Sequence, residues 1–189
     1  MLAIAALGCA APVAAQAPFI SFQAKDAGKS GGQGTVATCV NQSGTVAGRY
    51  ADSNYVTHGF VRSPSGQITE FNGTGNQSIT VTGINSSGQI IGNTQGVFLP
   101  RFTYAFLRNP DGGFVQIHPA GALQTSAGGI NDRGEIMGSY TDIGRTYQGF
   151  LRAADGSYLE FDEPDAVTGV NGQGTFAIEI NANGEIVGT

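Results

Sequence analysis

The sequence predicts an all-β fold, a β-propeller-like array of four-stranded antiparallel blades. Three observations predict it. An N-x-x-G element followed by two apolar residues and a glycine recurs four times, and a second conserved element lies between successive copies. No segment shows helical periodicity over ten or more residues. The units are blade-sized, because the anchor asparagines are 44, 46 and 50 residues apart, at Asn41, Asn85, Asn131 and Asn181.

The first element of each unit predicts a hairpin. Its copies are CVNQSGTVAG, GINSSGQIIG, GINDRGEIMG and EINANGEIVG, at 39–48, 83–92, 129–138 and 179–188. Asparagine caps turns through its side chain, and glycine supplies a positive φ. A short connection containing glycine between two apolar runs is a hairpin signal.

The second element predicts another hairpin. It occupies 58–71, 104–117 and 148–161, and the three copies align without a gap. A phenylalanine, an arginine and a glycine coincide in all three copies, the glycine in the turn at Gly66, Gly112 and Gly156. Two hairpins in succession make one four-stranded antiparallel unit.

Adjacent apolar pairs predict that both faces of each unit are buried. Examples are Phe60-Val61, Ile90-Ile91 and Phe150-Leu151. An isolated sheet would expose one of those faces to water, whereas stacked blades cover both. The 30 glycines and the charged fraction of 12%, against a usual value of about 25%, also fit a turn-rich β protein.

The chain resembles the bacterial extracellular HAF-type repeats, which are named for a His-Ala-Phe triplet and also carry a Gly-Ile-Asn element. The matching residues are His58-Gly59-Phe60, Tyr104-Ala105-Phe106 and Gln148-Gly149-Phe150, with Gly-Ile-Asn at 83–85 and 129–131. No copy keeps the full triplet. The resemblance implies a secreted propeller-like protein of bacterial origin and supplies no catalytic residues.

The amino terminus predicts export. Residues 1–17 form an Ala-rich apolar stretch typical of a signal peptide, and we expect cleavage after Ala15. A lipoprotein site at Leu7-Gly8-Cys9 is the alternative. The expected location is therefore secreted or extracellular, with the periplasm or the cell surface as alternatives, and no transmembrane segment is expected in the mature chain.

Residues 18–189 are predicted to form the repeat domain, with a partial unit at Asn181. Phe19-Ile20-Ser21-Phe22 parallels Tyr158-Leu159-Glu160-Phe161, so residues 19–22 predict an outer strand. Three full units and two partial ones predict an incomplete ring or a fragment of a larger one. An unclosed array has open strand edges, which favour self-association.

Two sets of equivalent residues are candidates for ligand binding. The first set contains three arginines, Arg62, Arg108 and Arg152. If the strand ends that carry these arginines face a central channel, their guanidinium groups would hold carboxylates or phosphates. Packing between blades is the alternative role for them. The second set contains two pairs of an aromatic and an acidic residue, Tyr50 with Asp52 and Tyr140 with Asp142. Such pairs would suit a sugar at a glycan-binding rim, and the alternative is that both tyrosines are packed in the core.

Charge and motifs narrow the function. The formal net charge of −5 and the absence of a Lys/Arg cluster argue against nucleic acid and anionic membranes. We find no catalytic signature, metal-ligand spacing or cofactor motif. We expect a structural or interaction module with an extracellular protein or glycan as partner. The alternatives are a carbohydrate- or small-ligand-binding propeller and a fragment of an extracellular hydrolase or lyase.

Overall fold

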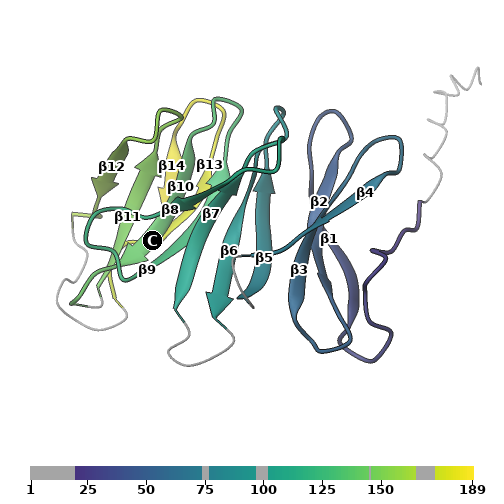
Figure 1. Ribbon diagram of the computed structural model, residues 1–189. Helices are drawn as coiled ribbons and strands as arrows, with labels where there is room; N and C mark the ends of the chain where they lie inside the picture. Colours follow the sequence, from purple (N-terminus) through teal and green to yellow (C-terminus); the bar gives the residue numbers. More distant parts are fainter. Residues whose placement is uncertain (1–19, 74–76, 97–101, 145, 165–172) are drawn as a thin grey trace, which may run out of the picture.

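The computed structural model describes residues 20–73, 77–96, 102–144, 146–164 and 173–189. The all-β prediction is confirmed, because these residues form fourteen strands and no helix. The strands make four antiparallel sheets that stand side by side (Figure 1). No sheet closes on itself among the described residues, and the predicted signal peptide, residues 1–17, lies outside them.

Three of the sheets have four strands in sequential order, as the two-hairpin pattern predicts. Sheet A contains β1 (Gly34–Val40), β2 (Val46–Ala51), β3 (Thr57–Arg62) and β4 (Ile68–Phe71). Sheet B contains β5 (Gln77–Ile84), β6 (Ile90–Gly96), β7 (Thr103–Arg108) and β8 (Phe114–Ile117). Sheet C contains β9 (Gln124–Ile130), β10 (Ile136–Thr141), β11 (Tyr147–Arg152) and β12 (Tyr158–Phe161). Sheet D is a hairpin of β13 (Ala177–Ile180) and β14 (Ile186–Gly188).

The N-x-x-G elements form the hairpin turns that the sequence predicts. In each turn the glycine N–H donates to the asparagine carbonyl, at 3.0 to 3.1 Å. The glycine has a positive φ in every copy, namely 81° at Gly44, 81° at Gly88, 78° at Gly134 and 86° at Gly184. Only glycine adopts this conformation without strain, which explains why it recurs there.

The apolar pairs bury both faces of a sheet, as predicted. Ile90 packs in a cluster with Ala47 and Phe71 of sheet A, whereas Ile91 packs in a cluster with Ile136 and Phe150 of sheet C. Ile90 and Ile91 are both 0% exposed. The core is therefore a series of apolar layers between successive sheets, and β13 continues it against β9 and β10.

Residues 20–33 precede β1 and cover the outer face of sheet A. Within the described ranges no strand pairs with residues 20–22, so this part of the predicted outer strand is not formed. Phe22 nevertheless packs on Phe60 with ring centroids 5.7 Å apart, as Phe71 packs on Phe106 at 6.5 Å. Residues 20–22 thus take the place on sheet A that β4 takes on sheet B.

Candidate functional site

The four N-x-x-G turns are joined by a ladder of asparagine side chains. The amide nitrogen Nδ2 of each asparagine donates to the backbone carbonyl of the next one, from Asn41 to Asn85 at 3.0 Å, and from Asn85 to Asn131 and Asn131 to Asn181 at 3.2 Å. The Oδ1 atom of the same side chain accepts backbone N–H groups within its own turn, for example from Ser43 and Thr45. One side chain therefore shapes its own turn and bonds the neighbouring sheet.

The three candidate arginines are packed against the sheets. The guanidinium carbon of Arg62 lies 5.1 Å from the ring centroid of Phe22, and that of Arg108 lies 4.8 Å from the ring centroid of Phe71. In all three arginines the NH1 atom donates at 3.3 Å to the carbonyl of the following residue. Arg108 is 9% exposed, and burial lowers the pKa of its guanidinium. Arg108 thus forms a cation–π pair between sheets B and A, and Arg62 forms the equivalent pair with the segment that precedes β1.

The candidate pair Tyr50 and Asp52 belongs to a polar cluster at the edge of sheet A opposite the N-x-x-G turns. The Tyr50 ring stacks on His58 with centroids 4.9 Å apart, and its hydroxyl donates to Glu70 at 3.3 Å. The His58 Nε2 lies 3.3 Å from the Asp52 carboxylate. Burial would raise the pKa of Asp52, but hydrogen bonds from Val56, His58 and Asn54 outweigh it and lower that pKa. Tyr50 is 4% exposed, so its ring offers no free face to a sugar.

The second candidate pair, Tyr140 and Asp142, has the equivalent place in sheet C. The Tyr140 hydroxyl donates to the Gln148 side-chain carbonyl, and the Gln148 amide donates to Asp142 at 3.4 Å. Burial, followed by the charge of Glu160, raises the pKa of Tyr140 to about 12. The two candidate pairs thus lie in separate sheets with sheet B between them, and the polar side-chain groups of both pairs are hydrogen-bonded within the chain.

Sheet B carries different residues at this position. The strand register aligns Thr94 with Tyr50 and Tyr140, because all three lie two residues beyond a glycine paired with the buried phenylalanine. A cavity of about 580 Å³ lies there. Its lining includes Thr94, Tyr104, Phe106, Phe114, Gln116 and His118. Comparing the tyrosine position across the three units would have indicated this cavity from the sequence.

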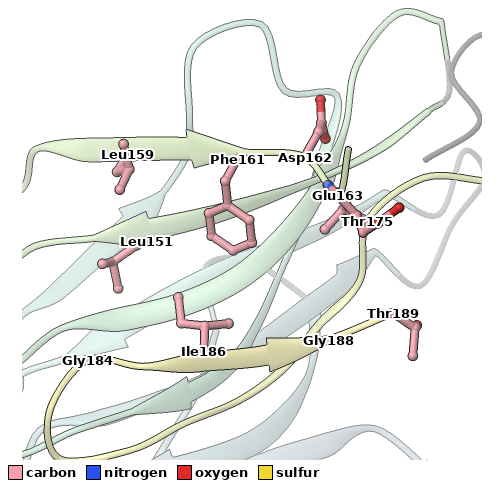
Figure 2. A pocket seen from close by; sticks show the side chains of 10 residues that line it. All are labelled: Leu151, Leu159, Phe161, Asp162, Glu163, Thr175, Gly184, Ile186, Gly188 and Thr189. Carbon is pink, nitrogen blue, oxygen red and sulfur yellow. Dashed lines mark hydrogen bonds between the residues drawn. The ribbon is translucent and has the colours of Figure 1, made fainter. Parts of the chain in front are cut away.

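A second hollow, a groove of about 390 Å³, lies between sheets C and D. Figure 2 shows Leu151, Leu159 and Phe161 on one side of this groove and Ile186 of β14 on the other. Asp162 and Glu163 lie near the end of β12. Leu159 is 63% exposed, so an apolar part of sheet C is uncovered here.

Within the described ranges, no group of three or more His, Cys, Asp or Glu side chains is arranged to hold a metal ion. In the same part of the chain, no helix is long and apolar enough to cross a membrane. No protein-family model matches this chain, and neither a curated protein nor a solved structure matches it.

Proposed function

We propose that this chain is a secreted structural module with a propeller-type arrangement of blades, which associates head to tail with a second copy of itself. A single observation carries the proposal. The same sheet-on-sheet contact is built repeatedly along the chain, and among the described residues complementary halves of that contact are exposed at sheets A and D. The resemblance to HAF-type repeats supports the propeller-type arrangement and the extracellular location.

The asparagine ladder supplies the polar part of the contact. The carbonyls of Asn85, Asn131 and Asn181 each accept an amide from the preceding asparagine. Among the described residues, the Asn41 carbonyl accepts only the N–H of Gly44 in its own turn. The Asn181 amide donates to Glu185 at 2.5 Å and to no further asparagine carbonyl within the described chain. The ladder thus has a free acceptor at sheet A and a free N–H at sheet D, and docking would join them.

Apolar side chains supply the second part. Val187 of sheet D is 61% exposed, whereas its equivalents Ala47, Ile91 and Met137 are each 0% exposed beneath a following sheet. Val40 of sheet A is 64% exposed, whereas its equivalents Ile84 and Ile130 pack against the preceding sheet. Docking sheet A of one copy on sheet D of another would cover both valines, as the internal contacts do, and burial of this apolar area favours association.

The third part of the contact would lie in the groove between sheets C and D (Figure 2). Residues 20–22 lie on sheet A where the outer strand of a preceding sheet would lie, and Ile20 is 62% exposed. In the docked pair these residues of the second copy would extend over Leu159 of the first. The contact is heterologous, because it joins two different surfaces.

Glutamate substitutions on the two faces test this association. Val187→Glu and Val40→Glu would each bury an unpaired carboxylate in the docked pair, so we expect each to weaken self-association at least about tenfold. Ile143→Glu introduces the same charge at a site that is 89% exposed and is the control. Sedimentation velocity over a range of protein concentrations measures the effect. A mixture of the two variants retains one intact pair of faces and is expected to form dimers that neither variant forms alone.

The mixture also distinguishes the alternatives. A wild-type chain that stays monomeric at every concentration would exclude the assembly. If cross-linking of that monomer then placed residues 20–22 beside sheet D, closure within one chain would be favoured instead. Recovery of no dimer in the mixture would exclude the head-to-tail arrangement even if the wild type associates.

A further inference from the structure

We infer that the cavity of sheet B is a binding site for a neutral saccharide. The site is separate from the proposed assembly faces, which lie on sheets A and D and in the groove between sheets C and D. Equivalent positions in the three four-stranded sheets carry different residues at this cavity.

The cavity exists because a large side chain is replaced by a small one. Tyr50 and Tyr140 fill this position in sheets A and C, where they are 4% and 3% exposed, and Thr94 stands there in sheet B. The residues that pack near this position also differ between the sheets. Ala24 and Ala27 cover Tyr50, and Ala122 packs in the cluster of Tyr140, whereas Thr94 is approached by Gly73, which has no side chain.

Three polar side chains that line the cavity differ from the two tyrosines in their hydrogen bonds, whereas the Thr94 hydroxyl donates to the Tyr104 carbonyl at 3.2 Å. The hydroxyls of Tyr50 and Tyr140 bond to Glu70 and Gln148. Over the described ranges, the Tyr104 hydroxyl, the Gln116 amide and the His118 ring make no hydrogen bond in the structure, and the bond at His118 is made by its backbone N–H to Tyr158. Gln116 and His118 are exposed, and each of the three groups can donate or accept a hydrogen bond.

The lining also contains no Asp, Glu, Lys or Arg side chain. Gln116 pairs with Phe106 where Glu70 and Glu160 pair with the equivalent phenylalanines of sheets A and C. The acidic groups of the two filled sites are therefore replaced by an amide. Phe114 is 40% exposed at the cavity, and its ring lies 5.4 Å from that of Phe106. Hydroxyl-bonding groups beside an exposed aromatic surface suit a ligand that presents both hydroxyls and C–H faces, which is the chemistry of a neutral sugar.

Calorimetric titration of the full chain with neutral and acidic oligosaccharides tests the inference. The probes are cellohexaose, laminarihexaose, mannohexaose and, as the charged comparison, a hexamer of galacturonate. We expect at least one neutral hexamer to bind saturably and the galacturonate hexamer to bind at least about tenfold more weakly, because the cavity offers no guanidinium or ammonium group.

Two variants locate the binding. Thr94→Tyr places in sheet B the residue of sheets A and C and is expected to abolish binding, and Gln116→Ala is expected to weaken it about tenfold by removing the amide. Tyr140→Phe, which removes the equivalent hydroxyl of sheet C, is the matched control and should bind as the wild type does. Circular dichroism confirms that each variant is folded. Absence of saturable binding by every neutral hexamer would overturn the inference, as would equal binding by Thr94→Tyr.

Discussion

Replacing Phe150 with alanine is expected to lower the free energy of unfolding by about 3–5 kcal/mol, the range for removing a buried phenylalanine ring. Phe150 is 0% exposed in the layer between sheets B and C. Its ring meets that of Tyr158 edge to face, with centroids 6.0 Å apart. Alanine would leave a cavity between two sheets that are held by that layer, so the loss includes both transfer and cavity terms.

Urea unfolding followed by circular dichroism measures this effect, because the chain has no tryptophan to report by fluorescence. Ile143→Ala, at a site that is 89% exposed, is the control and should change stability by less than about 0.5 kcal/mol. A loss below about 1 kcal/mol for Phe150→Ala would contradict the packing of sheet C against sheet B. Repeat arrays unfold in parts when neighbouring units separate, so the transition of the variant is also expected to broaden.

Replacing Gly138 with alanine is expected to destabilise the chain by about 3 kcal/mol, although it adds a single methyl group. A Cβ atom at Gly138 would lie 2.1 Å from the backbone oxygen of Ser126 and 2.6 Å from the Phe150 ring. The oxygen belongs to the neighbouring strand β9, so relief requires moving the backbone. Gly48 and Gly92 meet the same two obstacles in sheets A and B, and the corresponding alanine variants are expected to behave alike.

The control for Gly138→Ala is Gly31→Ala. Apart from Gly31 itself and its two chain neighbours, no residue has an atom within 4 Å of a Cβ built at Gly31, and its backbone φ is outside the positive region. Alanine there is expected to leave stability within about 0.5 kcal/mol of the wild type. Equal midpoints of thermal unfolding for the two variants would show that close approach of the phenylalanine ring does not explain the recurrent glycine.

The strand order could be predicted from the sequence because its signals are local. The turn glycines at Gly44 and Gly134 need a positive φ, and the pairs such as Ile90-Ile91 need cover on two faces. These features lie within one unit, so alignment of the units was sufficient. The contacts between units could not be predicted in the same way.

The ladder shows why. Asn85 was expected to cap its turn, and its Oδ1 does so, but the bond from its Nδ2 to Asn131 depends on how closely two sheets stack. The candidate tyrosines show the same limit. Equivalence of Tyr50 and Tyr140 was visible, whereas their burial depends on segments that precede each sheet. The cavity at Thr94 arises from a departure from the repeat, so the positions that agree between units do not indicate it.

The asparagine ladder also bears on how such a chain can change in length. Each rung bonds only to the next, so a duplicated unit inserted in frame brings both the donor and the acceptor that its neighbours require. A deletion of one whole unit leaves the remaining rungs equally matched. We therefore expect gene rearrangements that add or remove whole units to be tolerated, and the rung spacings of 44, 46 and 50 residues show that the connecting segments also absorb differences of a few residues.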